Sequence, residues 1–354
     1  MRTPIKITMQ VLLVMLMCLQ ICFAWIPSDQ HTRRSSQRMP QTRIWSTLEP
    51  LPKHEVNGGV SIAPPDVIQL ATEQRNLRFA GVGRLYAEES KHSPSVEPHI
   101  QVIDRLTQAT VVVVGLGGVG SWAAEALCRS GVGNLVLIDL DDICISNTNR
   151  QVHALSSTVG QMKIDEMKRR LLDINPECNV TLIHDFISNE NVHQILEGLL
   201  TDVTALLDGI DGAKAKSALL AACTDLRIPV VTSGGAAGRM DPTKIVCDDI
   251  AKVNDKLLAT CRKDMRKRYG FGTGLSFQAR QKGSKVKKWR IDAVYSLEEQ
   301  KALPSGEDAS SFRRCDGALG TSCFVTGSYG FAAASRVVEM IAKDRLRPPM
   351  RPKQ

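Results

Sequence analysis

The chain has 354 residues, 43% of them hydrophobic and 23% charged, which is the composition of a soluble globular protein with a sizeable core. Its formal net charge is +8, and the excess of cations is not spread evenly along the sequence. The ten cysteines include no C-x-x-C pair, which argues against a structural zinc site, and their scatter argues against a disulfide framework. We therefore expect reduced thiols and no zinc.

The N-terminal residues 1–24 have the features of a signal peptide. Arg2 and Lys6 precede an unbroken apolar run at 11–19, which small residues follow. The alternative is an uncleaved membrane anchor that extends to Ile26. Because the apolar run is much shorter than the roughly 20 residues that a membrane span needs, we expect no stable membrane insertion of the mature protein.

Residues 25–50 are rich in Ser, Thr and Arg and contain only Asp29 and Glu49 as acids, which is typical of a transit peptide. A signal peptide followed by such a segment resembles the bipartite presequence of algae with secondary plastids. We therefore expect a plastid location, with a mitochondrial or membrane-anchored protein as the alternative. A Pro/Gly linker, a folded unit and a tail are expected to follow at residues 51–65, 66–346 and 347–354.

Apolar runs that alternate with amphipathic helical patterns predict a doubly wound, mostly parallel α/β sheet of the Rossmann type. The expected strands are residues 110–115, 134–139, 179–185, 203–208 and 228–234. The expected helices are residues 121–131, 160–175 and 212–226 and a C-terminal helix at 327–346. Before that last helix the alternation breaks, and residues 240–325 predict a basic, loop-rich insertion.

A glycine-rich turn directly follows the first strand. Gly115, Gly117 and Gly120 fit G-x-G-x-x-G, in which the first glycine permits a tight turn and the second lets the backbone approach a phosphate. Asp139 ends the next strand, nineteen residues after Gly120, where a carboxylate meets ribose hydroxyls. These residues alone favour NAD.

The segments that follow favour ATP instead. The loop 139–151 carries acids, amides and Arg150, and Lys163 follows thirteen residues later. The fourth strand ends at Asp208, with Asp211 just beyond it. Attack of a carboxylate on the α-phosphate of ATP needs cations around the phosphorus and a carboxylate for Mg²⁺, whereas hydride transfer needs neither. Each charge taken singly is also compatible with a solvated loop.

The motifs GLGGVGS, LIDLDD, SNTNRQ, GQMK and DGID together resemble the adenylating fold of ubiquitin-activating-type enzymes, the ThiF group. RFAGVGRLY, NTNRQVHAL, VTSGGAAGRMDPTKI and CDGALGTSCFVTGSYGF make the chain similar to the tRNA threonylcarbamoyladenosine dehydratases. That resemblance covers residues 75–345 and implies ATP-dependent cyclisation of threonylcarbamoyladenosine beside the tRNA anticodon. It also implies a homodimer and a Mg²⁺ cofactor; a monovalent cation is a further candidate.

The resemblance implies a role for each matching residue. The nucleotide would be bound by Gly115, Gly117, Gly118, Gly120, Asp139, Asp141, Asn147, Arg150, Lys163 and Asp208. Asp139 would hold the ribose, and Arg150 and Lys163 would grip the phosphates, which Asn147 positions. Asp211 would hold Mg²⁺ and be the most important catalytic residue. Arg84, with Arg78 beside it, would reach the ATP of the partner subunit.

Two departures separate the chain from wider ubiquitin-activating-type enzymes. Those enzymes have Asp-Asn where this chain has Asp211-Gly212, and Cys247 and Cys261 occupy no recognisable nucleophile setting. This weakens the alternative function, an adenylating activator of a ubiquitin-like or sulfur-carrier protein. A non-catalytic NAD- or nucleotide-binding module is a third hypothesis.

The stretch 262–290 contains eleven Lys or Arg residues and a single acid, Asp264. Tyr269, Phe271 and Trp289 are interleaved with these cations. Phosphate backbones favour such a stripe, and unpaired bases stack on aromatic rings, so we predict contact with the tRNA anticodon loop. A solvated loop is the alternative.

Overall fold

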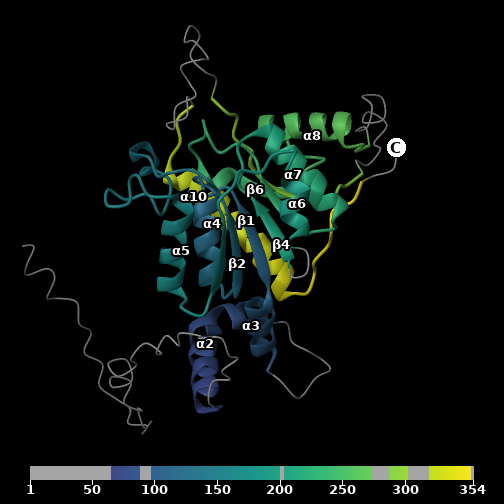
Figure 1. Ribbon diagram of the computed structural model, residues 1–354. Coiled ribbons are helices and arrows are strands. Elements are labelled where there is room, and N and C mark those ends of the chain that lie inside the picture. Colours follow the sequence, from purple (N-terminus) through teal and green to yellow (C-terminus); the bar gives the residue numbers. More distant parts are fainter. Residues whose placement is uncertain (1–64, 88–96, 200–202, 273–286, 302–318, 352–354) are drawn as a thin grey trace, which may run out of the picture. The chain divides into compact units, whose positions relative to one another are not determined.

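The computed structural model describes residues 65–87, 97–199, 203–272, 287–301 and 319–351 (Figure 1). These residues belong to one compact unit, Ala63–Gln354. The predicted presequence and most of the predicted linker lie outside them. No helix in the described ranges is both long and apolar enough to cross a membrane.

One sheet organises the described residues, with strand order β3-β2-β1-β4-β5-β7-β6. Its strands are β1 (Thr110–Val114), β2 (Asn134–Ile138), β3 (Asn179–Ile183), β4 (Val203–Asp208), β5 (Val230–Ser233), β6 (Ile245–Asp249) and β7 (Asp292–Ser296). All neighbouring strands pair in parallel except β6 and β7, which are antiparallel. The prediction of a doubly wound, mostly parallel sheet is confirmed.

Helices cover both faces of this sheet, and the four consecutive valines of β1 show why. Val111 and Val113 belong to one hydrophobic core and Val112 and Val114 to the other, because successive side chains in a strand point to opposite faces. The first core is shared with α3 (Pro98–Gln108), α4 (Gly120–Arg129), α5 (Lys163–Ile174) and α10 (Cys323–Ala342). The second is shared with α6 (Val192–Glu197), α7 (Ala213–Asp225) and α8 (Lys256–Arg268) (Figure 1).

Two helix starts differ from the prediction by three or four residues. The helix expected from residue 160 begins at Lys163, because Gly160 has a φ of +88° and Met162 is extended. The C-terminal helix begins at Cys323, four residues before the predicted start. Both differences lie at helix ends, where local pattern defines a boundary least well.

The expectation of a loop-rich insertion at 240–325 is wrong for much of that segment. A short helical turn, η2 (Pro242–Lys244), leads into β6, and β6 and β7 extend the sheet beyond β5 with α8 between them in sequence. Both strands have five residues and mixed polarity, which leaves little periodic signal in the sequence. The parts of the insertion at 273–286 and 302–318 lie outside the described residues.

A helix pair precedes the sheet. α2 (Pro65–Tyr86) packs on α3, and the carbonyl oxygen of His99 would lie 2.7 Å from a Cβ atom at Gly83. Only a glycine therefore allows the two helices to approach this closely. Because α3 ends at Gln108, two residues before β1, the pair lies at the amino ends of the parallel strands (Figure 1).

Candidate functional site

Three parallel strands deliver the predicted site residues to one edge of the sheet. Gly115 follows β1, Asp139 follows β2 and Asp208 ends β4, so all three lie at the carboxyl edge. β1 lies between β2 and β4, and the chain reverses its direction of winding there. Ligands of open α/β sheets bind outside the carboxyl ends of strands at such a switch point.

The glycine loop between β1 and α4 has the geometry that its spacing predicts. Gly115 has a φ of +83°, and a Cβ atom at Gly120 would lie 1.8 Å from the carbonyl oxygen of Gly115. No atom lies within 4 Å of a Cβ built at Gly117, so the backbone there is open to a close approach. The first turn of α4, whose N-cap Val119 provides no side-chain cap, leaves N–H groups for an anion. Gly118 instead makes room for Thr326 of α10, 3.0 Å from its built Cβ.

Asp139 joins the glycine loop to the loop after β2. Its buried carboxylate accepts hydrogen bonds from the backbone N–H of Leu116 at 2.5 Å and of Asp141 at 2.8 Å. An ionised carboxylate has about four acceptor positions, so each oxygen can still accept a ribose hydroxyl. The predicted ribose ligand is therefore in place and held rigidly.

The loop after β2 is ordered by its own polar side chains. Asn147, in the turn η1 (Ile145–Asn147), is buried and accepts a hydrogen bond from the Cys144 N–H at 3.1 Å. Arg150 donates to the Ser146 carbonyl at 2.7 Å, and its own carbonyl accepts from the Trp122 indole at 2.9 Å. Asn147 thus shapes the loop, and Arg150 is anchored to α4 beside the glycine loop.

Lys163 is the other predicted phosphate ligand. Its Nζ lies 2.6 Å from Oδ2 of Asp141, and its side chain is only 7% exposed, against 51% for Asp141. Among the described residues Asp141 is the one ion-pair partner of this buried ammonium, and because that carboxylate is half-exposed, a phosphate oxygen can replace it. The connection from β2 to the first residue of α5 contains Asp139, Asp141, Arg150 and Lys163 and places them at the carboxyl edge, as predicted.

The two aspartates at the end of β4 and just beyond it differ in their burial and in their partners. Asp208 is fully buried, and its Oδ2 lies 2.6 Å from both Lys216 Nζ and Thr232 Oγ1. That carboxylate holds α7 and β5 together and is not available to a nucleotide, contrary to the prediction. Asp211 is exposed and makes no hydrogen bond or ion pair with another described residue. Asp211 is therefore a free carboxylate at this edge, just beyond β4.

Sequence reasoning missed Lys216 and His153. Lys216 lies on the buried face of α7, and only a lysine within an otherwise apolar helical stripe signals it. His153 is 2% exposed, and neither ring nitrogen has a partner among the described residues. Burial, and then the charges of Lys163 and Arg170, lower the pKa of His153 to about 3, so its imidazole is neutral at physiological pH.

Arg78 and Arg84, the two arginines of α2 that the resemblance singles out, lie at the other edge of the sheet. Arg78 donates to the carbonyl of Ile174 at 2.8 Å, at the end of α5 and before β3 begins. Arg84 is exposed in the last turn of α2, beside α3 and the amino end of β1. A strand of five residues spans about 17 Å. Arg84 therefore does not lie at the glycine loop of its own chain.

The described part of the chain contains no group of three or more His, Cys, Asp or Glu side chains that could hold a metal ion. The donor chemistry at the carboxyl edge nevertheless suits Mg²⁺, which is commonly bound by one or two carboxylates together with substrate phosphates and water. Asp211, an exposed carboxylate with no partner among the described residues, fits this requirement.

Two aromatic residues of the basic stretch, Phe271 and Trp289, are buried and do not offer exposed surfaces to bases. Trp289 and Phe271 are 2% and 1% exposed and pack with ring centroids 4.8 Å apart. The Tyr269 hydroxyl donates to Asn189 at 2.8 Å. The prediction that Trp289 and Phe271 stack on bases is therefore wrong. Lys285 lies outside the described residues, whereas Lys288 is exposed.

Residues 93–350, more than half of the chain, match the ThiF family. The chain belongs to the ThiF family. This ThiF-family protein is 40% identical over 271 residues to a tRNA threonylcarbamoyladenosine dehydratase of Haemophilus influenzae, covering 76% of this chain and 94% of that protein. It is 38% identical over 277 residues to the Escherichia coli dehydratase, with 75% and 94% covered. It is 34% identical to the E. coli molybdopterin-synthase adenylyltransferase, but over only 138 residues.

Solved structures agree with these matches. The E. coli tRNA N6-threonylcarbamoyladenosine dehydratase in complex with ATP superimposes with a TM-score of 0.61 and 36% identity, over 75% of this chain and 94% of that chain. The same enzyme in complex with AMP gives a TM-score of 0.62 and 35% identity, over 79% and 98%. The resemblance that the sequence motifs indicated is confirmed.

Proposed function

We propose that this ThiF-family protein is an ATP-dependent tRNA threonylcarbamoyladenosine dehydratase. The observation that carries the proposal is the 40% identity to such a dehydratase over 94% of its length, because it includes the segments beyond the nucleotide motifs. Those segments contain β6, β7 and α10. A protein similar only in its nucleotide-binding half would not match them.

In the proposed reaction the threonyl carboxylate attacks the α-phosphorus of ATP and displaces pyrophosphate. The neighbouring carbamoyl group then attacks the acyl adenylate, AMP leaves, and the nucleoside has lost the elements of water. Asp139 orients the ribose, while Arg150 and Lys163 stabilise the negative charge that builds on the phosphates. Bound Mg²⁺ would supply further charge stabilisation, and Asp211 would hold it.

A homodimer is part of the proposal, and two features of α2 support it. Arg84 lies at the amino edge, so it can contribute to a nucleotide site only in another subunit. Leu77 and Leu85 are 76% and 75% exposed, and Leu70 is 39% exposed. At 3.6 residues per turn these leucines lie on the same side of α2 as Arg84. An exposed apolar stripe of this kind favours association with a second copy.

The alternative, activation of a ubiquitin-like or sulfur-carrier protein, would be favoured by a reactive thiol. Partial desolvation, and then the charge of Asp292, raise the pKa of Cys247 to about 11. Burial raises the pKa of Cys261 to about 11 as well. Thiols with such pKa values contain little thiolate at neutral pH, so neither residue is a good nucleophile.

The proposed compartment is a plastid reached through the two presequence segments. This proposal rests on the composition of residues 1–50 alone. Fusing those residues to a fluorescent protein in an alga with a secondary plastid would test it, and retention of the fusion in mitochondria or membranes would contradict it.

The experiment that tests the function follows release of AMP from Mg-ATP. We expect AMP with tRNA that carries threonylcarbamoyladenosine and none with a transcript of the same tRNA that lacks this modification. AMP release with a carrier protein but not with modified tRNA would favour the alternative function.

A further inference from the structure

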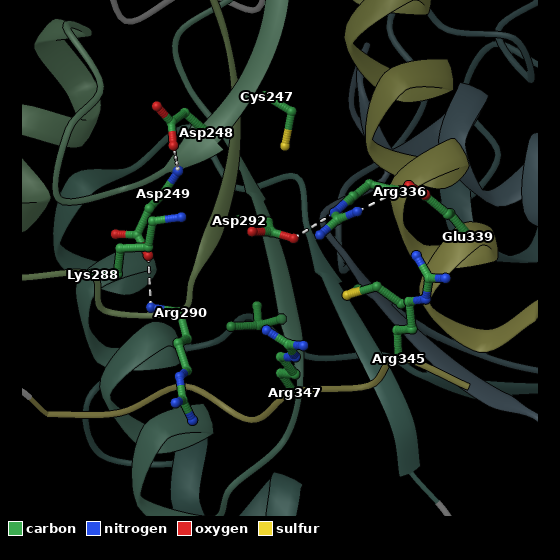
Figure 2. Close-up of a pocket in the computed structure, with 12 residues that line it drawn as sticks. Cys247, Asp248, Asp249, Lys288, Arg290, Asp292, Arg336, Glu339, Arg345 and Arg347 are labelled. Carbon is green, nitrogen blue, oxygen red and sulfur yellow. Dashed lines mark hydrogen bonds and ion pairs between the residues drawn. The ribbon is translucent and has the colours of Figure 1, made fainter. Parts of the chain in front are cut away.

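A second concave site lies at the amino edge of the sheet, away from the glycine loop. It is a cavity of about 610 Å³ between the amino ends of β5 and β7, the end of β6, α10 and the chain after α10. We call it the amino-edge cleft and define it by the cations Lys288, Arg290, Arg345 and Arg347 that line it (Figure 2). Lys288 and Arg290 belong to the basic stretch, whereas Arg345 and Arg347 follow α10.

The acids of the cleft are already engaged. Arg336 lies 2.6 Å from Asp292 and 2.9 Å from Glu339, as the dashed lines in Figure 2 show. Asp249 accepts hydrogen bonds from the backbone N–H groups of Trp289 at 3.0 Å and Arg290 at 2.7 Å. Asp248 accepts from the Asp249 N–H at 2.7 Å and lies 3.7 Å from Lys252.

Three cations of the cleft have no such partner. The side chains of Lys288, Arg290 and Arg347 make no hydrogen bond or ion pair with any other described residue. Lys288 and Arg290 are exposed, so each can take an anion from solution. The cleft therefore carries cations without an ion-pair partner on two sides, together with Asp249, whose carboxylate is met by backbone N–H groups alone.

The backbone that carries Lys288 and Arg290 is held in place by contacts with other segments. Trp289, between Lys288 and Arg290, is 2% exposed, and its carbonyl accepts a hydrogen bond from the Met350 N–H at 2.9 Å. The Arg351 guanidinium lies 5.6 Å above the ring of Phe271, which packs on Trp289. The chain after α10 is thereby fixed against the basic stretch, although more than fifty residues separate Arg290 from Arg345.

We propose that the amino-edge cleft binds phosphodiester groups of the tRNA backbone, as a contact separate from the nucleotide that reacts. Arg and Lys bind phosphate groups through charge-assisted hydrogen bonds, and Lys288 and Arg290 of the cleft belong to a stretch with eleven cations and one acid. The sheet edges are only about 17 Å apart, so a folded RNA is large enough to contact both. The inference rests on the proposed function, which supplies RNA as the substrate.

The test compares tRNA binding over a range of salt concentrations for the parent, Lys288→Glu and Arg347→Glu. The matched control is Lys168→Glu, which makes the same change in charge on α5, outside the cleft. Each cleft variant should bind tRNA about five- to tenfold more weakly at 0.15 M salt, and its log–log salt slope should fall by roughly 0.7–0.9 per lost contact. The control should keep the parent slope.

Two further measurements identify the ligand. The cleft variants should lose affinity for a transcript without threonylcarbamoyladenosine by the same factor as for modified tRNA, because contacts to the RNA backbone carry no information about the bases. The cleft variants should also raise the KM for tRNA while kcat at saturating tRNA and the affinity for ATP stay unchanged. A lower kcat at saturating tRNA in correctly folded variants would overturn the proposal.

Competition with inorganic phosphate separates RNA from a small anion. If phosphate protects the parent but not the cleft variants against unfolding, and all the proteins bind tRNA with one salt slope, the cleft binds a free anion and the proposal is wrong. If the parent converts modified tRNA but the cleft variants bind tRNA with the affinity and the salt slope of the parent, the inference about the cleft is wrong while the proposed function stands. If the parent converts no tRNA, the proposed function itself fails.

Discussion

The ammonium group of Lys163 lies 2.6 Å from the carboxylate of Asp141, at the carboxyl edge where the glycine loop opens. Asp141 is half-exposed and lies on the same loop as Asp139. The ion pair therefore fixes the position of the Lys163 ammonium group at this edge, and a phosphate group can replace Asp141 as its partner. This relationship makes the nucleotide site partly preformed.

The first prediction concerns this ion pair. Lys163→Ala should weaken ATP binding by about 10- to 100-fold, because a hydrogen bond to a charged group contributes roughly 1.5–3 kcal/mol. Lys168→Ala, on the same helix, is the matched control and should bind ATP like the parent. Isothermal titration with Mg-ATP makes the comparison, and parent-like affinity in Lys163→Ala would remove this residue from the site.

The second prediction concerns the free carboxylate. Asp211→Asn should retain ATP binding within a few-fold but lower kcat by roughly 100-fold or more, because the metal ligand acts on the developing charge. Asp208→Asn should behave differently and lose stability, since it leaves Lys216 buried without its counter-charge. Single-turnover rates and thermal unfolding distinguish the two. A normal rate in Asp211→Asn would mean that the metal site lies elsewhere.

The third prediction concerns the dimer. Arg84→Ala and Asp211→Asn should each be inactive, yet a mixed population that has exchanged subunits should recover about one quarter of the parent activity. Half of such dimers would be mixed, and each would contain one site with both residues intact. No recovery, with exchange demonstrated by native mass spectrometry, would show that Arg84 does not complete a partner's site.

The fourth prediction concerns pH. The pKa of His153 falls from about 6.5 in the unfolded chain to about 3 in the fold, so between these values only the unfolded chain takes the proton. The contribution of His153 to the free energy of unfolding is therefore fully present above pH 6.5. It is lost as the pH falls towards 3, and about 2 kcal/mol of it is lost at pH 5.

His153→Gln should remove this part of the pH dependence of the free energy of unfolding, whatever the substitution does to stability at neutral pH. His184→Gln is the control, because His184 is 44% exposed and bonds to Asp165. Urea unfolding at pH 7 and at pH 5 gives the loss of unfolding free energy between these pH values for each variant and for the parent. If His153→Gln loses as much stability between these pH values as the parent, the buried imidazole does not titrate as described.

The sequence predicts those features that a few neighbouring residues determine. The apolar runs predict β1 to β5, and the glycine spacing predicts the turn at Gly115, because the allowed backbone angles and the packing at Gly120 are local properties. Asp139 is placed at the carboxyl edge for the same reason, because it directly follows a strand end, whereas the roles given to Asp139 and Lys163 stay predictions.

The features that were missed or wrong depend on residues far apart in the chain. Burial of Trp289 depends on Phe271 and on the segment after α10, and no local pattern distinguishes it from an exposed aromatic residue. Asp208 lost its predicted role because Lys216 and Thr232 converge on it. The amino-edge cleft likewise combines two segments that meet only in the folded chain.

The most direct test of the account is nucleoside analysis by mass spectrometry of threonylcarbamoyladenosine-modified tRNA after incubation with the protein and Mg-ATP. The account predicts a modified nucleoside lighter by one water molecule, formed in equal amount to AMP and absent when Asp211→Asn replaces the parent. Recovery of the unchanged nucleoside, from tRNA that the protein binds in the presence of ATP, would contradict it.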